Sequence, residues 1–142
     1  MTLHLIKLCA GANGIEDLRA RMKASVARNL KLRGRRVHTH ETRMFPRRCE
    51  ELLNGGSLYW VIRGVILVRQ KIIEIEAFSA EDGTGRCAIV LDPTLVETNA
   101  APRRAFQGWR YFDDGDAPRD LSAGDGSAPA ALRARLAELG LL

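Results

Sequence analysis

The stretch SLYWVIRGVILVRQKIIEIEAF, residues 57–78, constrains the fold of this chain most strongly. It is rich in β-branched and aromatic residues, which favour extended backbone on a pleated, half-buried surface. Gly64 stands inside it, where a glycine indicates a bulge or a sharp bend between strands. On a strand, alternation places Trp60 on one face with Leu58 and Ile62, so we expect Trp60 in the core. The segment therefore predicts the centre of a β-sheet.

The segments around this sheet alternate between strand and helix patterns. Residues 3–9 alternate as a strand, and Asn13 with Glu16 has the spacing of a helix cap. Apolar residues then follow at helical spacing in a helix that ends near Gly34: Ile15, Leu18, Met22, Val26 and Leu30. The later segments predict, in order, extended backbone at 36–44, a short helix at 47–54 after Pro46, a turn at 81–85, a strand at 86–92 ended by Pro93 and extended backbone at 94–98. This order predicts an α+β fold with a curved sheet, mixed or mostly antiparallel.

The length of 142 residues suits one domain with a real core. We expect residues 1–112 to form this domain. Residues 113–127 are rich in Asp, Gly and Ser, which indicates a loop or linker. Residues 128–142 carry leucines at helical spacing and predict a C-terminal helix that docks on the domain or on a partner.

The net charge of +5 conceals an asymmetry between the two halves of the chain. Residues 1–71 hold 15 Lys and Arg against 5 Asp and Glu, whereas residues 72–142 hold 7 against 12. A basic half fits a polyanionic partner, but it also fits attraction between the two halves within one fold. Both interpretations stay open at this point.

The three cysteines, Cys9, Cys49 and Cys87, are odd in number and form no CxxC pair. Their spacing predicts neither a disulfide framework nor a zinc site, so we expect reduced thiols in the cytoplasm. Cys49 and Cys87 are expected to be inert buried thiols.

The N-terminus does not have the pattern of a signal peptide, no apolar stretch is long enough to cross a membrane, and no cofactor motif stands out.

The run HTHE contains His38, His40 and Glu41. On a strand the two imidazoles project to the same face, where they could share a metal with a third ligand. We favour the alternative, two solvent-facing histidines on an edge strand, because the chain has one other histidine, His4, and no specific carboxylate partner. No metal is therefore predicted.

Arginines and aromatic rings gather in PRRAFQGWRYF, residues 102–112, and arginines also flank the predicted short helix and the long strand segment. Guanidinium groups suit phosphate and carboxylate, and exposed rings can stack on bases. Trp109 fits either the core or such a stacking platform. The residues expected to bind nucleic acid are Arg43, Arg47, Tyr59, Arg63, Arg69, Arg103, Arg104, Trp109 and Arg110.

Three motifs, GGSLYWVIRGVILVRQKIIEIE, GRCAIVLDP and PRRAFQGWRY, resemble a family of short bacterial proteins known as domain of unknown function 1489. The resemblance extends from the N-terminus to about Tyr111 and implies no activity or cofactor. More distantly, CEELLNGGSLYWVIRG is similar to the PUA-like superfamily, including its ASCH modules. That resemblance implies a small β-barrel that binds RNA or modified bases, although the Gly-x-Lys-x-x-Glu-x-Arg pattern of many ASCH domains is absent.

These observations predict a cytoplasmic module that binds nucleic acid, above all RNA, in an arginine-lined groove. A first alternative is an enzyme for a small anionic or nucleobase-like substrate, with Glu74, Glu76 or Asp92 as acid or base. A second alternative is a protein-interaction module that uses the C-terminal helix.

Overall fold

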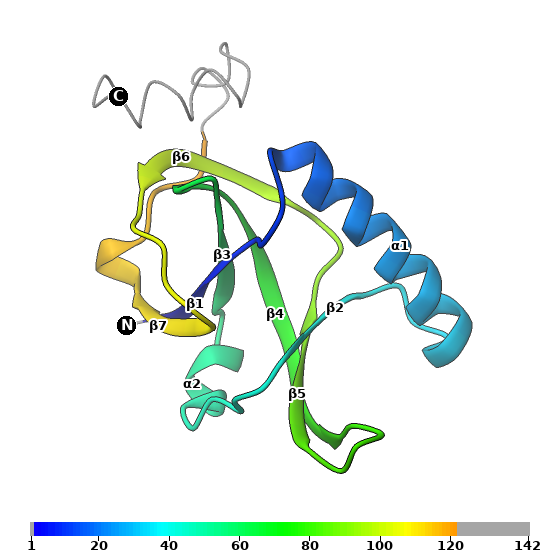
Figure 1. The fold of residues 1–142 in the computed structure, drawn as a ribbon. Coiled ribbons are helices and arrows are strands. Elements are labelled where there is room, and N and C mark those ends of the chain that lie inside the picture. Colours follow the sequence, from blue (N-terminus) through cyan, green and yellow to red (C-terminus); the bar gives the residue numbers. More distant parts are fainter. Residues whose placement is uncertain (1, 122–142) are drawn as a thin grey trace.

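The computed structural model of the protein describes residues 2–121. Strands and helices follow the order expected for an α+β fold (Figure 1). Their bounds are β1 Leu3–Leu8, α1 Ile15–Arg33, β2 His38–Thr42, α2 Cys49–Leu53, β3 Ser57–Ile62, β4 Val65–Ser79, β5 Gly85–Leu91, β6 Val96–Pro102, β7 Trp109–Asp113 and the 3-10 helix η1 Asp114–Asp116. No helix in this part of the chain has the length and apolar character that crossing a bilayer requires.

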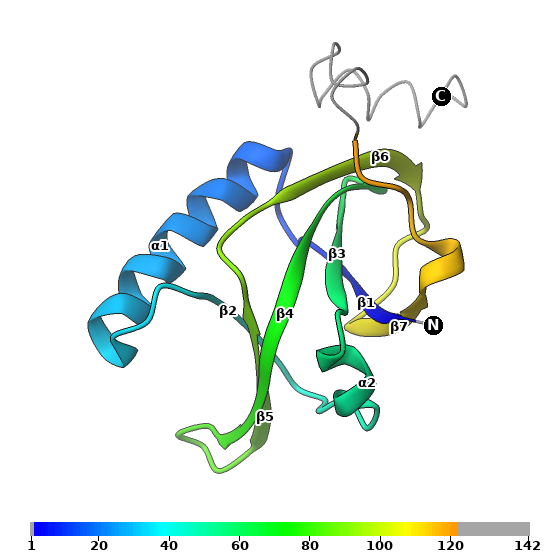
Figure 2. The ribbon, with the colours of Figure 1, turned by 180° about the vertical axis from the view of Figure 1, so that it is seen from behind.

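The strands of residues 2–121 form one mixed sheet in the order β2-β5-β4-β3-β1-β7, with β6 paired to β4. β1 runs parallel to β3, and the other pairs are antiparallel. The long strand β4 is the spine of this sheet. Its first half pairs with β3 on one edge and β6 on the other, and its second half pairs with β5. The β4–β5 hairpin extends beyond the rest of the domain (Figure 2).

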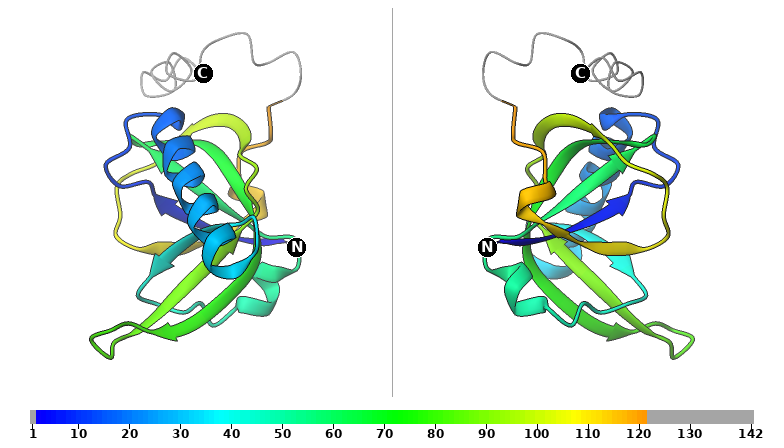
Figure 3. Two further views of the ribbon diagram at one scale, coloured as in Figure 1. Left: turned by 90° about the vertical axis from the view of Figure 1, so that its right-hand side faces the viewer. Right: turned by 90° about the vertical axis from the view of Figure 1, so that its left-hand side faces the viewer.

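The sheet is not closed into a barrel, because β2 and β7 stand at the two ends of the strand order without pairing to each other. This corrects the PUA-like barrel implied by the distant resemblance. The outer edge of β2 is covered by α1, which lies across one face of the domain beside this strand (Figure 3). A covered edge does not need a further strand to satisfy its backbone groups.

Both faces of β3 are buried, which explains why its sequence is apolar at nearly every position. Trp60, on the face toward α1, lies in the larger core cluster and is 2% exposed, as predicted. Tyr59 and Val61 point to the other face and pack with Phe112 of β7 in a second cluster. A strand buried on two sides has no polar face to reveal its orientation.

The bend predicted at Gly64 is a tight turn between β3 and β4. Arg63 and Gly64 have φ values of 51° and 80°. Positive φ at both central residues is the geometry of the type I′ hairpin turn, which fits the twist of the flanking strands. The predicted turn at 81–85 and the strand that ends before Pro93 are also present, and β6 continues along β4 beyond that proline.

Helix α1 ends at Gly34 as predicted, but its buried face departs from the predicted apolar stripe. Ile15 and Leu18 are buried, whereas Leu30 is 55% exposed. The C-terminal half of the helix instead buries Ser25 and Asn29. The Asn29 side-chain amide donates to Val37 O at 2.9 Å, and Ser25 Oγ accepts the Thr39 backbone N–H at 3.0 Å. The edge strand β2 has unpaired backbone groups there, so polar side chains fit better than leucine.

The first part of the segment expected as a linker, 113–127, belongs to the packed domain. It contains η1, and Thr98 and Asp120 form a β-bridge. The backbone N–H of Asn99 donates to Arg119 O at 2.8 Å, and that of Leu121 donates to Glu97 O at 3.0 Å. Residues 114–121 are thereby held against β6. The predicted C-terminal helix at 128–142 lies outside the described residues.

Candidate functional site

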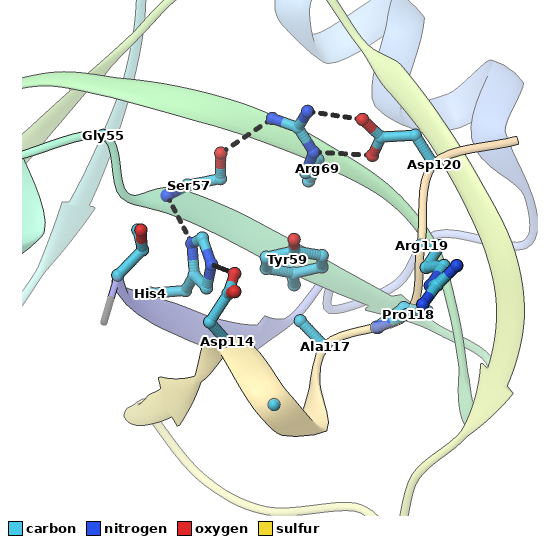
Figure 4. A pocket seen from close by; sticks show the side chains of 12 residues that line it. His4, Gly55, Ser57, Tyr59, Arg69, Asp114, Ala117, Pro118, Arg119 and Asp120 are labelled. Carbon is cyan, nitrogen blue, oxygen red and sulfur yellow. Dashed lines mark hydrogen bonds and ion pairs between the residues drawn. The ribbon is translucent and has the colours of Figure 1, made fainter.

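A cavity of about 560 Å³ lies between β3, β4 and the segment 114–120 (Figure 4). We call it the His4 cavity. Most of its lining side chains are polar or charged, and they come from β1, the start of β3, β4 and the residues after β7. The lining residues are Thr2, His4, Gly55, Ser57, Tyr59, Arg69, Asp114, Gly115, Ala117, Pro118, Arg119 and Asp120.

One wall of the cavity is a hydrogen-bonded chain from Asp114 through His4 to Ser57 (Figure 4). The backbone N–H of Ser57 donates to His4 Nδ1 at 2.9 Å. A backbone N–H can only donate, so Nδ1 carries no hydrogen and Nε2 carries it. Nε2 then donates to Asp114 Oδ1 at 2.8 Å. Both ring nitrogens of this buried histidine are therefore occupied.

The opposite wall is an ion pair between Arg69 and Asp120. Arg69 donates from Nε and Nη2 to the two carboxylate oxygens of Asp120, at 2.8 and 2.7 Å. Its Nη1 donates to Ser57 Oγ at 2.9 Å, so Ser57 connects the two walls. The hydrogen bonds from Arg69 hold the pKa of Asp120 below its ordinary value. These contacts fix the polar groups of the cavity in place before any ligand arrives.

Tyr59 lies between the two walls and is 4% exposed. Its ring makes edge contacts with the rings of His4 and Phe112, at centroid distances of 5.0 and 5.3 Å. The ring is therefore part of the core rather than an open platform. Burial raises the pKa of its hydroxyl, so this group stays a neutral donor and acceptor.

Ser57, His4 and Asp114 have the residue types of a nucleophilic triad but not its geometry. In a triad the histidine nitrogen next to the serine accepts the hydroxyl proton. Here His4 Nδ1 already accepts the backbone N–H of Ser57, and Ser57 Oγ accepts from Arg69. Ser57 consequently has no base in this arrangement. The arrangement therefore lacks the general base that nucleophilic attack by Ser57 would require.

Arg119 differs from Arg69 in that its side chain forms no ion pair among the described residues. Its side chain is exposed and lines the cavity beside Tyr59 and Pro118 (Figure 4). Within residues 2–121 no carboxylate pairs with it, whereas Arg69 is held by Asp120.

Among the predicted nucleic-acid-binding residues, Tyr59 and Arg69 line the His4 cavity and are cross-strand neighbours. Trp109 is partly buried, packs on the larger core cluster, and donates from Nε1 to Met44 O at 2.9 Å. The remaining predicted residues lie outside this cavity: Arg43, Arg47, Arg63, Arg103, Arg104 and Arg110. The His4 cavity therefore holds two of the nine predicted residues.

Two of these outlying arginines stack on rings of the domain. Arg103 lies over Phe112 at 5.5 Å and donates from Nη2 to Asp116 O at 3.1 Å. Arg110 lies over Phe106 at 5.0 Å. The cluster of rings and arginines in residues 102–112 is therefore explained in part by internal cation–π contacts.

The carboxylates considered as acid or base also lie outside the cavity. Glu76 pairs with Arg33 at the end of α1, and Glu74 pairs with Arg35 just after this helix, each at 2.9 Å. Both pairs are partly exposed and join the β4–β5 hairpin to the end of α1. Contact with Arg35 lowers the pKa of Glu74, which keeps it ionised. These pairs fit a structural role.

The two histidines of the HTHE run do not face solvent, which corrects the interpretation favoured from the sequence. Both pack against Trp60, and His38 is 5% exposed. Gln70 Oε1 accepts a hydrogen bond from Trp60 Nε1 at 2.9 Å. Because an amide oxygen only accepts, His38 Nδ1, 3.0 Å from the same oxygen, is a donor. Among the described residues no group of three His, Cys, Asp or Glu side chains could hold a metal ion. Glu41 is exposed on the same strand.

The cysteines within residues 2–121 are free thiols. Burial raises the pKa of Cys87 to about 11 and also raises the pKa values of Cys9 and Cys49. Protonated thiols are weak nucleophiles.

Comparison with known proteins places the chain in a family. A family model described as "Protein of unknown function (DUF1489)" matches residues 5–142. The chain belongs to this family. Neither the curated proteins nor the solved structures contain a match to this DUF1489 chain. The description of DUF1489 names no activity, so the geometry of the cavity carries the functional argument.

Sequence reasoning missed most residues of the His4 cavity. His4 stood in the first strand, and Asp114, Arg119 and Asp120 stood in the segment interpreted as a linker. The acidic run DDGDAPRD was a usable signal, since carboxylates next to a basic half can form internal ion pairs. What it could not show is that Arg69 is the partner.

Proposed function

We propose that this DUF1489 protein binds a small polar ligand with one anionic group, of the size of a nucleoside monophosphate, in the His4 cavity. The observation that carries the proposal is the guanidinium of Arg119, which has no carboxylate partner within residues 2–121 and lines the same cavity as the hydroxyls of Ser57 and Tyr59. A guanidinium offers a fork of donors to phosphate or carboxylate. The volume of about 560 Å³ fits the range of roughly 300–1,000 Å³ typical of small-molecule sites.

The charges of the cavity favour a ligand with a single anionic group. Arg69 and Asp120 neutralise each other. One oxygen of Asp114 accepts from His4, and no donor among the described residues hydrogen-bonds to its other oxygen. A carboxylate repels a second anionic group and accepts hydroxyl or amino donors. Arg119 would therefore hold the anionic end, and Asp114 with Tyr59 would hold the polar remainder. Small anionic compounds were also the substrates of the enzyme considered as the first alternative from the sequence. Here such a compound is proposed as a bound ligand.

Calorimetry with the four ribonucleoside monophosphates, ribose 5-phosphate and inorganic phosphate tests this proposal. We expect at least one sugar phosphate to bind with a Kd below about 1 mM. Arg119→Gln should weaken that binding about tenfold or more, because it removes a charge-assisted contact. Arg36→Gln, an exposed arginine outside the cavity, is the matched control. Equal affinity in wild type, Arg119→Gln and Arg36→Gln would contradict the proposal, as would binding of none of the compounds.

A second candidate function is binding of single-stranded RNA, favoured by arginines that remain free of carboxylates. In the described part of the chain the exposed side chains of Arg43, Arg47, Arg63, Arg104 and Arg110 form no ion pair. Arg63 precedes Gly64, whose carbonyl accepts the backbone N–H of Arg103 at 2.7 Å. Arg103 in turn contacts Asp116 beside the His4 cavity. RNA phosphates could bind along the surface between Arg63 and Arg103 while one nucleotide enters the His4 cavity.

Fluorescence anisotropy of a labelled RNA at 50–300 mM salt tests the second candidate. Each phosphate contact adds about 0.7 to the slope of log affinity against log salt for a single strand. The combined variant Arg63→Gln, Arg104→Gln and Arg110→Gln should lower this slope by about 2. Affinity that does not change with salt, or a slope that the triple variant leaves unchanged, would remove RNA binding from consideration.

A further inference from the structure

A second, smaller cavity of about 120 Å³ lies between β1, α1, β2 and β3, apart from the His4 cavity. We call it the Cys9 cavity. It is lined by Lys7, Leu8, Cys9, Ala10, Leu18, Arg21, His38, His40 and Trp60. None of these residues lines the His4 cavity, and none has a role in the proposed function.

The lining of the Cys9 cavity contains two cations and no carboxylate. Within residues 2–121 neither Lys7 nor Arg21 takes part in an ion pair. Asp17 is close enough to act on the Cys9 thiol, but its carboxylate accepts the backbone N–H of Asn13 at 2.7 Å and does not line the cavity. Positive charge therefore converges here without an internal counterion, in contrast to the paired walls of the His4 cavity.

His40 adds an unsatisfied polar atom to the same cavity. Its Nε2 is buried and has no hydrogen-bond partner in the part of the chain that the structure describes. Two other polar atoms on this wall, His38 Nδ1 and Trp60 Nε1, both have Gln70 Oε1 as their partner. A buried polar atom without a partner is uncommon and indicates a missing ligand, ion or water.

Arg21 is held at the cavity by two neighbours. Its Nη1 donates to Cys9 Sγ at 3.6 Å, which leaves most of its five donors free. Its Nη2 lies over Gly11, where an added Cβ would approach to 3.3 Å. Gly11 has φ of 76°, so the backbone turn and the space for the guanidinium both depend on this glycine.

The surroundings of Lys7 and His40 disfavour their positively charged forms. Burial lowers the pKa of Lys7, and burial together with Lys7, His38 and Arg21 lowers the pKa of His40 to about 4. Both shifts show that positive charge is disfavoured in this place. A negative charge among the three side chains would offset that penalty.

We propose that the Cys9 cavity binds a small oxyanion of the size of inorganic phosphate, through Lys7, Arg21 and Nε2 of His40. The donors come from β1, α1 and β2, so they approach the anion from different sides and match an anion with several oxygens. The volume of about 120 Å³ is well below the roughly 300–1,000 Å³ typical of sites for larger small molecules, so it suits one phosphate group better than a nucleotide.

The proposal is tested by NMR titration of the full chain with sodium phosphate at constant ionic strength, with sodium chloride as the reference salt. We expect saturable shifts of the His40 ring and the Trp60 indole signals in phosphate, and none in chloride. Lys7→Gln and Arg21→Gln should each weaken phosphate binding about tenfold or more. Arg36→Gln, an exposed arginine after α1, and Arg119→Gln in the His4 cavity should leave it unchanged.

Each other outcome overturns the proposal. Equal shifts in chloride would show general screening, and unchanged affinity in both Lys7→Gln and Arg21→Gln would place the anion elsewhere. Loss of binding in Arg119→Gln alone would assign the phosphate to the His4 cavity. Because Arg21 contacts Cys9, thermal unfolding of each variant is measured in parallel. If Arg21→Gln does not fold, Lys7→Gln, a half-buried side chain without a hydrogen bond among the described residues, decides the question.

Discussion

The Nδ1 atom of His4 accepts the backbone N–H of Ser57 at 2.9 Å, and this contact links β1 to the start of its parallel neighbour β3. The same ring donates to Asp114 after β7, so one imidazole joins three separate parts of the chain. The histidine is a structural part of the cavity wall, and its occupied nitrogens are the reason why Ser57 lacks a base.

Replacing this imidazole should destabilise the domain. His4→Ala leaves the buried Ser57 N–H without a partner and frees the Asp114 carboxylate, and we expect a loss of about 2–4 kcal/mol in the free energy of unfolding. Urea denaturation measures this change. Glu81→Ala, in the exposed turn after β4, is the control and should change stability by less than about 0.5 kcal/mol. Equal stability of the two variants would contradict the structural role of His4.

Gln70 should be equally sensitive because four partners, His38, Trp60, Asp92 and Met22, share its fully buried side chain. Its Oε1 accepts from Trp60 and His38, and its Nε2 donates to Asp92 O at 3.0 Å. Gln70→Leu fills the space but leaves these groups unpaired, with an expected loss of about 3 kcal/mol. Denaturant unfolding checks this value against Gln107→Leu, which is exposed. A loss below about 1 kcal/mol would show that the network relaxes around leucine.

Gly56 is required by close approach rather than by its φ value. An added Cβ would overlap the carbonyl oxygens of Leu3 and Leu52, both backbone atoms that cannot move aside easily. We expect Gly56→Ala to cost about 3 kcal/mol or more, since α2 and β1 would have to separate. Gly85→Ala is the matched control, because no atom lies within 4 Å of its added Cβ. Comparable melting temperatures of both variants would disprove the steric argument.

The pairing of Arg69 with Asp120 should be visible in the titration of the carboxylate. Hydrogen bonds from Arg69 lower the pKa of Asp120, so the pair stabilises the fold above the ordinary aspartate pKa and loses this effect as pH falls through the lowered value. In Arg69→Gln the pKa of Asp120 should rise to the ordinary range. Carbon-detected NMR of the side-chain carboxyl measures it. An unchanged pKa would mean that Arg69 and Asp120 do not pair in solution.

Acid should weaken the fold through His40. Burial and the positive groups that face it, Lys7 on β1, Arg21 on α1 and His38 on β2, lower its pKa from 6.5 to about 4. The unfolded chain therefore binds a proton that the native chain refuses, and stability falls as pH drops from about 6.5 to about 4. The total effect is at most about 3 kcal/mol.

His40→Asn removes this titration, so the difference in stability between wild type and variant should shrink or reverse as pH falls through that window. Unfolding measured at pH 7 and pH 4.5 for both proteins tests this, because the carboxylates titrate alike in both. Phosphate should reduce the wild-type slope if the Cys9 cavity holds an oxyanion. A difference that stays constant with pH would show that His40 titrates normally.

The sequence was most informative where one residue type has a single local explanation. Gly34 ends α1, Pro93 separates β5 from β6, and Trp60 is in the core, as the patterns predicted. Such features depend on neighbouring residues and on alternation along one strand, so they can be inferred without knowing the rest of the fold.

Predictions from local sequence patterns were wrong where a side chain contacts a segment that is distant in the sequence. Leu30 matched an apolar stripe, yet Ser25 and Asn29 occupy the buried face because the edge of β2 needs hydrogen bonds there. The histidines of HTHE looked suited to solvent, yet Trp60 covers them.

The candidate cavities belong to this second class of feature. Residue types and local periodicity determined the order of strands and helices, the α+β class and the membership of DUF1489. Only the tertiary structure decided that, within residues 2–121, Asp120 neutralises Arg69 while no carboxylate pairs with Arg119. It likewise decided that Lys7, Arg21 and His40 line one cavity to which the described residues contribute no carboxylate. The physical reason is that charge pairing and burial depend on distances across the fold, which separations along the chain do not encode.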